Sequence, residues 1–274
     1  MNVKETSDIE TIKAVRFFIN DRTKEITDNV IKEVPVFVKL SEEEICMLMS
    51  TPSMLKELCI GYLFTEGIIQ NIIEVKHIEV TKEDDHYKIN LEILPEKEKL
   101  VRKRASEAKS LKNRLFANDK MDLSYLETIG LLKRQIVYPH VKCDRRILFD
   151  VVSKLNSRAF LYRITGGTHA AIITDIYGKE LAFAEDIGRY NAIDKAVGQL
   201  LLKGDKNRAY IMAVSGRLSS KIVLKVARVG IPLLISNTAV TSYGVRICEK
   251  LGLTLVGFVR EGRMNVYTHA WRIL

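Results

Sequence analysis

Long apolar runs and paired cysteines are both missing from this sequence. No stretch of about 18 apolar residues occurs, so no membrane-spanning helix is expected. The first residues, MNVKETSDIETIK, lack the apolar segment of a secretory signal, and we expect a cytoplasmic protein. The four cysteines, Cys46, Cys59, Cys143 and Cys248, lie far apart and form no CxxC, which removes the commonest local signature of a zinc or redox site. Each is expected to be an unreactive thiol, although a single thiol can still react.

Several catalytic signatures are also absent. A Walker loop, GxxxxGK[ST], does not occur, so ordinary nucleotide hydrolysis has no local support. His169 is followed by two alanines and no PCxxC exists, which excludes the zinc site of a deaminase. The sequence GRLSS does not form a nucleophile elbow, and no internal repeat is found. We therefore expect no metal.

Positive charge is abundant and locally concentrated. The chain has a net charge of +9, and the segment from Glu96 to Lys120 holds nine basic residues against four acidic ones. This segment is interpreted as a solvated helix or a basic linker, or alternatively as a docking arm for an acidic partner. A nucleic-acid-binding role is a further hypothesis, but Phe116 is the only aromatic residue there that could stack on a base, so we consider it unlikely.

The first third of the chain predicts a small α+β domain over residues 1–98. The helix that follows Thr51-Pro52-Ser53 has Ser53 as its predicted N-cap and ends at Thr65-Glu66-Gly67, and an acidic turn joins a predicted hairpin. The predicted strands are 14–18, 33–40, 78–81 and 86–94. A basic helical linker is predicted over 99–136, with a helix over 124–132.

The remainder, 137–274, alternates between strands and helices. Asp144 is the predicted N-cap of a helix over 145–155, and a hairpin joins 170–175 to 180–184. The predicted order is then helix 191–202, strand 209–214, helix 219–229, strand 231–235, helix 241–251 and strand 253–259. Helices of this length between strands predict right-handed crossovers and a parallel sheet, to which the hairpin adds antiparallel strands. The predicted fold class is therefore α/β, a three-layer α/β/α mixed sheet with a smaller N-terminal domain.

Polar junctions follow the predicted strands. DIGRYNAIDK (186–195), SGRLS (215–219), SNTAVTS (236–242) and REGR (260–263) each follow an apolar strand. Ligands of open α/β sheets bind beyond the carboxyl ends of the strands, where helix N-termini favour anions. We therefore predict one binding surface for a ligand with several phosphates. Its candidate residues are Gly166, Gly167, His169, Asp186, Arg189, Asn191, Asp194, Lys195, Ser215, Gly216, Arg217, Phe258, Val259, Arg260, Glu261, Gly262 and Arg263.

Each candidate also has a structural interpretation. Ser219 can serve only as a helix cap, Gly216 only as a turn residue, and His169 only as a hydrogen-bonded structural histidine. Asp186 can pair with Arg189, and Asp194 with Lys195 can form a solvated helix face. Arg260 and Arg263 can be simple surface charges.

Several motifs resemble one known family. TGGTHAA (165–171), AEDIGRYNAIDKAVG (184–198), SGRLSSKIVLK (215–225) and TLVGFVREGRMNVYTH (254–269) resemble the FdhD family of formate dehydrogenase accessory proteins, as does STPSMLKELCIGYLFTEGII (50–69). The resemblance implies a cytidine deaminase-like fold and a cytoplasmic sulfur carrier, which takes sulfur from a cysteine desulfurase and passes it to the bis-molybdopterin guanine dinucleotide form of the molybdenum cofactor for formate dehydrogenase. It implies that Phe258 to Arg263 bind the cofactor. We also expect the chain to form a homodimer.

The chain departs from this resemblance at specific places. Where the family has a CxxC between its domains, this sequence runs from Phe116 to Ser124 without cysteine. Asp and Ser cannot accept sulfur, since the step requires an S–S bond. Cys143 is the nearest thiol in sequence and the candidate sulfur carrier. Tyr190, Lys221, Val240 and Ser50 stand where the family usually has His, Glu, Pro and Arg. Two hypotheses stay open: a sulfurtransferase, and a chaperone that binds the cofactor or a guanine nucleotide without catalysis.

Overall fold

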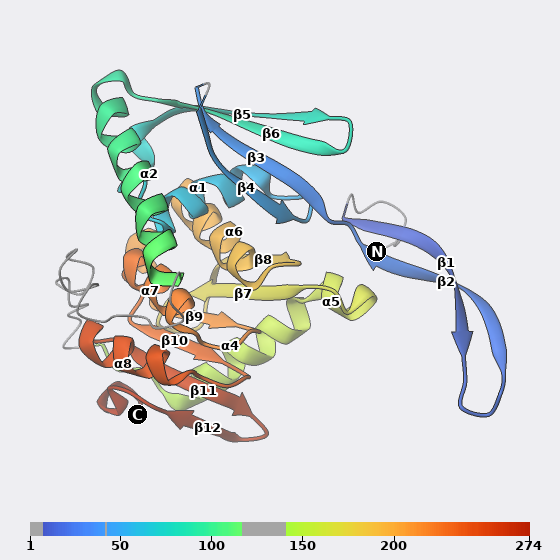
Figure 1. Cartoon of the computed structure of the whole chain (residues 1–274). Helices are drawn as coiled ribbons and strands as arrows, with labels where there is room; N and C mark the ends of the chain where they lie inside the picture. Colours follow the sequence, from blue (N-terminus) through green and yellow to red (C-terminus); the bar gives the residue numbers. More distant parts are fainter. Residues whose placement is uncertain (1–7, 42, 117–140) are drawn as a thin grey trace.

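The structure is a computed structural model that describes residues 8–41, 43–116 and 141–274. Three sheets are present in these residues: a two-stranded, a four-stranded and a six-stranded one (Figure 1). The predicted helix over 124–132 and most of the segment expected to replace the CxxC lie outside the described residues. Within them, no helix combines the length and apolar character needed to span a bilayer.

The six-stranded sheet is mixed, as the sequence predicts. Its order is β12-β11-β10-β9-β7-β8, with β9, β10 and β11 parallel and the other neighbouring pairs antiparallel. The strands are β7 (His169–Thr174), β8 (Glu180–Asp186), β9 (Ile211–Val214), β10 (Leu233–Ser236), β11 (Thr254–Arg260) and β12 (Arg263–Val266). The helices that pack on it are α4 (Arg145–Arg158), α5 (Phe160–Thr165), α6 (Arg189–Leu202), α7 (Ser220–Val229) and α8 (Ser242–Leu251).

Alternating side chains divide this sheet between two layers. On β7, Ala170 and Ile172 pack toward α4, whereas Ala171 and Ile173 pack toward the layer that contains α6. Strands buried on both faces carry near-continuous apolar sequences, which is why these strands were recognisable. The predicted three-layer α/β/α arrangement is therefore seen in the packing. The cytidine deaminase-like label stays a prediction.

The first part of the chain forms its own sheet. Strands β3 (Val34–Leu40), β4 (Glu43–Ser50), β5 (Val75–Glu83) and β6 (His86–Ile93) lie in the order β4-β3-β6-β5. Helix α1 (Leu55–Thr65) lies between this sheet and α6 in Figure 1. The predicted Ser53 cap is wrong: the N-cap residue is Met54, in the left-handed region at φ 55°, and it makes no side-chain cap bond. The Ser53 amide instead donates to Asp8 Oδ1 at 2.9 Å.

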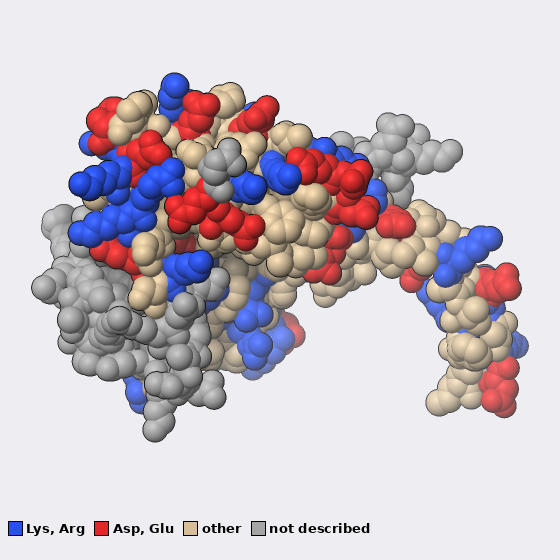
Figure 2. All heavy atoms as spheres, turned by 45° about the horizontal axis from the view of Figure 1, so that its top comes forward, with Lys and Arg blue, Asp and Glu red and all other residues tan. Residues whose placement is uncertain are grey.

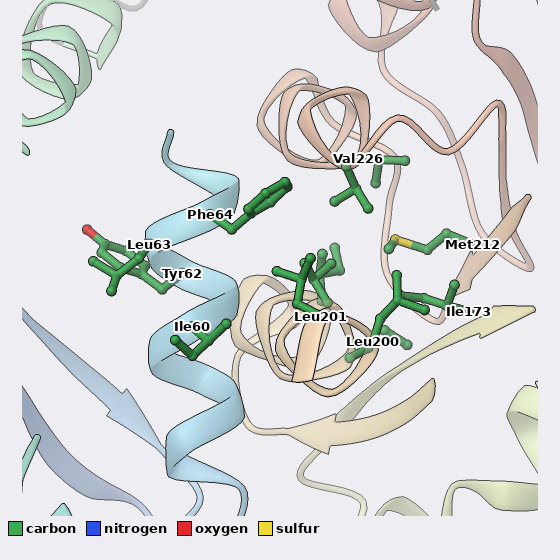
Figure 3. Packing of buried hydrophobic residues seen from close by; sticks show 14 of the residues in the cluster. Ile60, Tyr62, Leu63, Phe64, Ile173, Leu200, Leu201, Met212 and Val226 are labelled. Carbon is green, nitrogen blue, oxygen red and sulfur yellow. The ribbon is translucent and has the colours of Figure 1, made fainter. Parts of the chain in front are cut away.

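The two parts share one apolar core. Ile60 and Phe64 of α1 lie on the side that faces Leu200 and Leu201 of α6, whereas Leu63 lies beside Tyr62 on the opposite side of the helix (Figure 3). Gly61 and Gly198 allow this approach, because a Cβ on Gly61 would lie 1.7 Å from the Asp194 carbonyl oxygen and one on Gly198 would lie 1.9 Å from that of Glu57. The predicted domain boundaries at 98/99 and 136/137 stay predictions, but the described residues on either side of them are packed into a continuous hydrophobic cluster.

The basic segment contains a helix that begins before the predicted linker. Helix α2 spans Pro95–Phe116, and its own residue Val101 is buried. Arg102 pairs with Glu43 and Glu98, and Arg104 pairs with Glu74. Figure 2 shows lysine and arginine side chains gathered near acidic ones on this face. The helix is therefore docked on the first part of the chain, and part of its charge is neutralised.

A β-hairpin projects from the body of the molecule. Its strands β1 (Ile9–Phe17) and β2 (Thr23–Ile31) pair with each other alone, and Figures 1 and 2 show them extending away from the remaining elements. Almost every residue of β1 is exposed, and the tip carries Phe17, 77 % exposed, with Phe18 and Ile19 beside it. We call residues Ile9–Ile31 the arm. Only a strand over 14–18 was predicted here, so the hairpin itself was missed.

Candidate functional site

The carboxyl ends of four strands lie at one edge of the six-stranded sheet. Strands β9, β10 and β11 are parallel, β7 is antiparallel to β9, and β8 is antiparallel to β7, so β8 runs in the same direction as β9. The polar junctions after β8, β9, β10 and β11 therefore meet at one edge, together with His169 at the start of β7. The four junctions are thus neighbours, as expected from the strand order, whereas their role in binding a ligand stays a prediction. We call this region the ligand edge.

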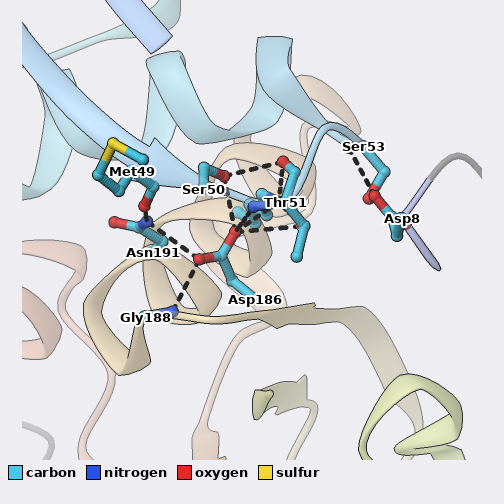
Figure 4. Close-up of polar contacts among 9 residues, drawn as sticks. Asp8, Met49, Ser50, Thr51, Ser53, Asp186, Gly188 and Asn191 are labelled. Carbon is cyan, nitrogen blue, oxygen red and sulfur yellow. Dashed lines mark hydrogen bonds and ion pairs between the residues drawn. The ribbon is translucent and has the colours of Figure 1, made fainter. Parts of the chain in front are cut away.

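Asp186 lies beneath the ligand edge, with no exposed surface. Its Oδ2 accepts from the Ser50 hydroxyl at 2.7 Å and the Thr51 amide at 3.1 Å, and lies 2.7 Å from Lys195 Nζ. Its Oδ1 accepts from the Gly188 amide and from Asn191 Nδ2 (Figure 4). The predicted Asp186–Arg189 ion pair is wrong, because Lys195 is the counter-ion. These contacts fix the end of β4 to α6 and occupy both carboxylate oxygens.

Asn191 and Lys195 take part in the same contacts. Asn191 Nδ2 also donates to the Met49 carbonyl oxygen at 2.7 Å, and Lys195 Nζ donates to the Thr51 hydroxyl at 2.6 Å. Burial lowers the pKa of Lys195 against the opposing charge of Asp186. The two residues hold the first part of the chain in place, and Lys195 has no surface to offer to a ligand.

Asp194 belongs to a second buried cluster, at the other end of α1. Its carboxylate accepts from the Thr65 hydroxyl at 2.6 Å and pairs with Lys225 Nζ at 2.9 Å, and Lys225 also pairs with Glu66 at 2.7 Å. The interpretation of Asp194 and Lys195 as a solvated helix face is wrong, since both are buried. Apolar neighbours on both sides, such as Ile193 and Ala196, were the sequence signal for this burial.

A group of polar residues lies at the partly exposed surface of the ligand edge. Ser215 Oγ accepts from the Ala170 amide at 2.9 Å and lies 3.4 Å from His169 Nδ1. A Cβ on Gly216 would contact Arg189 Cβ and Cδ at 3.4 Å, so the Arg189 side chain runs over this glycine. Burial and the charge of Arg189 lower the pKa of His169, although Asp186 opposes them, which favours a neutral imidazole. Arg217 is exposed beside this group.

The loop after β10 closes against the loop after β9. Leu218 and Val240 form an isolated parallel bridge, and Ser236 Oγ donates to the Gly216 carbonyl oxygen at 3.0 Å. Ser219 is the N-cap residue of α7, as predicted, but makes no side-chain cap bond. Thr241 is the N-cap of α8 and accepts from the Gly244 amide. The two loops thus form one continuous stretch of surface.

The segment from Phe258 to Arg263 forms a tight hairpin that sequence reasoning missed. Glu261 and Gly262 have φ values of 53° and 73°, and Arg260 and Arg263 face each other across the turn. Positive φ at both central residues is typical of a type I′ turn, and Gly262 was its signal in the sequence. Arg260, Glu261, Gly262 and Arg263 are exposed, whereas Val259 is buried under α4 and Phe258 is half-buried. The structure thus places Arg260 and Arg263 opposite each other at the end of the last strand of the ligand edge.

The glycines that precede β7 lie at the root of the arm. Gly166 is the C-cap of α5 at φ 68°, and a Cβ on Gly167 would lie 2.7 Å from Ile31 Cγ2 at the end of β2. Both therefore have a structural reason to be glycine. Their predicted contact with a ligand stays a prediction.

The four thiols differ in exposure. Cys143 is 1 % exposed, and burial together with Asp144 raises its pKa to about 11. Cys59 and Cys248 are fully buried, and burial raises both of their pKa values. Cys46, on β4, is partly exposed. Since the thiolate is the reactive form, Cys143 is poorly placed as a sulfur carrier. Among the described residues, no cluster of three or more His, Cys, Asp or Glu side chains is arranged to hold a metal ion.

The fold and the ligand edge define a mixed α/β protein with cationic loops at the carboxyl ends of its strands. Comparison with known sequences agrees with the resemblance in its motifs. The FdhD/NarQ family is matched by residues 31–274, and the chain belongs to this family. The match begins at the end of β2, so nearly the whole arm precedes it.

Known relatives and a solved structure align with most of the chain. The chain is 36 % identical to "Sulfur carrier protein FdhD" of Saccharolobus solfataricus over 84 % of both chains. It is 34 % identical to the protein of that name from Sulfurisphaera tokodaii, over 96 % of this chain and 99 % of the relative, and 30 % identical to that of Bacillus subtilis, over 97 % and 98 %. A crystal structure from Desulfotalea psychrophila, described as a formate dehydrogenase accessory protein, has a TM-score of 0.74 at 24 % identity and covers 97 % of this chain and 100 % of that one. That likeness supports the mixed α/β fold.

Proposed function

We propose that this protein is a cytoplasmic accessory protein of formate dehydrogenase maturation that binds the bis-molybdopterin guanine dinucleotide cofactor at the ligand edge. Family membership and the name shared by its relatives, sulfur carrier protein, support this class of function. The main structural support for cofactor binding is that four arginines lie at one edge of the sheet: Arg189, Arg217, Arg260 and Arg263.

The residues present fit a polyanionic cargo. Among the described residues, no carboxylate lies within 4 Å of the Arg189, Arg217 or Arg260 guanidinium groups, and the Arg263 contact with Glu261 is long, at 3.8 Å. Guanidinium forks bind phosphate oxygens in pairs. The Arg260–Arg263 pair would hold one phosphate group, and Arg217 with the loop amides near Gly216 would approach another. The buried Asp186, Asp194 and Lys195 would support these loops from below.

Binding of GDP to the purified protein tests this proposal. Isothermal titration is expected to show binding that is lost or strongly weakened in an Arg260→Ala, Arg263→Ala double variant. A Lys97→Ala, Lys99→Ala variant on α2 removes the same charge from exposed positions outside the ligand edge and is expected to bind as the parent protein does. Absence of GDP binding, or unchanged binding in the Arg260/Arg263 variant, would overturn the assignment of the site.

For sulfur transfer, a second candidate function, we propose Cys46 rather than Cys143 as the acceptor. Cys46 is partly exposed, whereas the other three thiols are buried. In this step the Cys46 thiolate attacks the terminal sulfur of a cysteine desulfurase persulfide. The new S–S bond forms at Cys46 as the old one breaks, and the desulfurase thiolate leaves with the electron pair.

Persulfide trapping after incubation with a desulfurase separates the two thiols. Label is expected on the parent protein and on Cys143→Ser, and is expected to be lost from Cys46→Ser. Loss of label in Cys143→Ser alone would restore the first assignment. Absence of label on every variant would leave the non-catalytic cofactor-binding chaperone as the function.

We propose that the protein is a homodimer and that the arm contacts a second copy of the chain. An isolated two-stranded hairpin is marginally stable in water, so its exposed faces and apolar tip call for a covering surface. The arm carries four acidic and four basic residues. This neutrality favours a copy of the same chain over a strongly charged partner.

Sedimentation velocity tests the role of the arm. The parent protein is expected to sediment as a dimer, and a Phe17→Ser, Phe18→Ser, Ile19→Ser variant as a monomer. A Lys24→Ser, Glu25→Ser variant changes equally exposed polar residues of β2 and is expected to remain dimeric. A parent protein that is monomeric at all concentrations, or a triple variant that stays dimeric, would contradict this interface.

A further inference from the structure

Two cations from different helices converge on the ring of Tyr190. The Arg189 guanidinium carbon lies 4.6 Å from the ring centroid, and its Nη2 donates to the Tyr190 hydroxyl at 3.2 Å. The Lys221 Nζ, from the first turn of α7, lies 4.3 Å from the same centroid. Tyr190 itself is half-buried and packs against the large apolar cluster, which holds its ring in place beside both charges.

This group lies within the ligand edge. Arg189 runs over Gly216, next to His169 and Ser215, and Ser219 contacts Tyr190 from the loop after β9. The groups that face Tyr190 are Arg189 from α6 and Ser219 and Lys221 from the start of α7, and the charge of Lys221 also acts on Glu66 at the end of α1. Among the described residues, no carboxylate pairs with Arg189.

The arrangement concentrates positive charge around a hydrogen-bonding hydroxyl. Two like charges held near each other repel, and the face of an aromatic ring offsets this only in part. An anion that reaches both cations offsets the repulsion more fully, because charge-assisted hydrogen bonds are stronger than contacts with a ring. The phenolic hydroxyl can add one donated hydrogen bond to such an anion.

We propose that Arg189, Tyr190 and Lys221 form a phosphate subsite of the ligand edge, separate from the Arg260–Arg263 hairpin. Arg189 and Lys221 supply charge, and the Tyr190 hydroxyl donates a hydrogen bond to one phosphate oxygen. This inference rests on the proposed function for the identity of the whole ligand, but the subsite requires only a phosphate group. Inorganic pyrophosphate is therefore a sufficient probe.

The ionisation of Tyr190 reports on this subsite. Burial acts to raise the pKa of Tyr190, but its contacts with Ser219 and Arg189 and the charges of Arg189 and Lys221 outweigh burial and lower it. A bound phosphate partly neutralises these cations and needs the protonated hydroxyl as a donor. Binding therefore raises the pKa of Tyr190, and by linkage the affinity for the anion falls as Tyr190 ionises.

The experiment is a tyrosinate absorbance titration of the full chain with and without saturating pyrophosphate. The difference between the parent protein and Tyr190→Phe isolates Tyr190. This residue is expected to titrate below an ordinary tyrosine, and pyrophosphate is expected to move its titration upward. Calorimetry is expected to show pyrophosphate binding about tenfold weaker in Lys221→Met and in Arg189→Met. The Arg260→Ala, Arg263→Ala variant is expected to keep the upward shift.

The outcomes separate this subsite from the proposed function. If GDP binds the parent protein but Lys221→Met, Arg189→Met and Tyr190→Phe bind it with unchanged affinity, the subsite is wrong and the function stands. If GDP does not bind but pyrophosphate shifts Tyr190, the subsite stands and the nucleotide is wrong. A Tyr190 titration that pyrophosphate leaves unmoved overturns the subsite in either case. Lys221→Gln, which keeps a polar side chain, distinguishes loss of charge from loss of folding.

Discussion

Adding one methyl group where α1 crosses α6, by replacing Gly61 or Gly198 with alanine, is expected to push the two helices apart and to lower the stability of the fold. In Gly61→Ala, the new Cβ would lie 1.7 Å from the Asp194 carbonyl oxygen, whereas Cβ contacts under 3.0 Å essentially never occur. The helices must therefore move apart by at least 1.3 Å, the difference between these values. Gly198→Ala creates the same problem, with 1.9 Å to the Glu57 carbonyl oxygen.

Two effects determine how much the free energy of unfolding falls in these variants. Overpacking a tight contact costs about 1–3 kcal/mol, and a gap of about 0.5–1 Å along the remaining interface forfeits a quarter to a half of each contact's dispersion energy. The displacement also stretches the buried clusters around Asp186 and Asp194, which bridge the same two parts. Alanine offsets about 1 kcal/mol through its better helix propensity. We expect the free energy of unfolding to fall by about 3 kcal/mol in either variant.

Guanidinium unfolding of the two variants and of a control gives the comparison. Gly204→Ala meets no atom within 4 Å but has φ 74°, so it is expected to lose only about 1–2 kcal/mol through backbone strain. The double variant Gly61→Ala, Gly198→Ala is expected to lose less than the sum of the single variants, because the first substitution already opens the crossing. Stabilisation of about 1 kcal/mol by Gly61→Ala, as helix propensity alone predicts, would refute the close packing.

Four further expectations follow from individual groups. Cys46 is expected to react with a thiol reagent in the native protein while the three buried cysteines react only after unfolding, and one fast thiol persisting in Cys46→Ser would contradict this. Lys225→Met is expected to cost about 3–5 kcal/mol in denaturant unfolding because it leaves the buried Asp194 carboxylate without its counter-ion, and a neutral result would show that the pair is not needed. Burial lowers the pKa of His169 in the folded state, so the stability that this residue contributes is present above its ordinary pKa of 6.5 and is lost as the pH falls through the lowered value. His169→Asn is expected to flatten this part of the plot of stability against pH. An unchanged plot would contradict this expectation. Arm amides are expected to exchange hydrogen more slowly in the dimeric parent protein than in the Phe17→Ser, Phe18→Ser, Ile19→Ser variant, because the second copy covers the arm, and equal exchange in the two proteins would contradict this contact.

The part of the chain in which strands and helices alternate was predictable, because short-range sequence patterns define its elements. The β7–β8 hairpin, the Asp144 cap and the succession of helices and strands after residue 190 all follow from short-range patterns. Two of the missed elements, β2 and β12, have weaker patterns. Strand β2 reads TKEITDNVI, which is largely polar because the arm buries little, and β12 is a short exposed edge strand. Tertiary context, rather than sequence alternation, defines these two strands.

The site was predictable in position but not in detail. The edge of the sheet follows from topology, so the four junctions could be placed together. The division of their residues into buried and exposed groups could not be predicted, because Asp186 finds its partners Ser50 and Thr51 more than 130 residues away in sequence. Contacts between residues so far apart in sequence produce no periodic sequence pattern from which they could be recognised. The polar signature DIGRYNAIDK therefore combines internal contacts of Asp186 and Lys195 with a partly exposed group at Arg189 and Tyr190.

The positions at which this chain departs from the expected family pattern are not independent of one another in space. Tyr190 and Lys221 touch, at 4.3 Å between ammonium and ring, and Ser50 donates to Asp186 directly beneath the same edge. A His and a Glu at positions 190 and 221 would place a carboxylate where this chain has an ammonium group, a change of two charge units at one point of the ligand edge. Compared with that His and Glu, Tyr190 and Lys221 would attract phosphate more strongly. Val240, which bridges to Leu218, lies on the adjacent loop. Tyr190, Lys221, Ser50 and Val240 thus lie at or beneath one surface, so exchanging them together would alter the charge and shape of the ligand edge without changing the sheet that positions it.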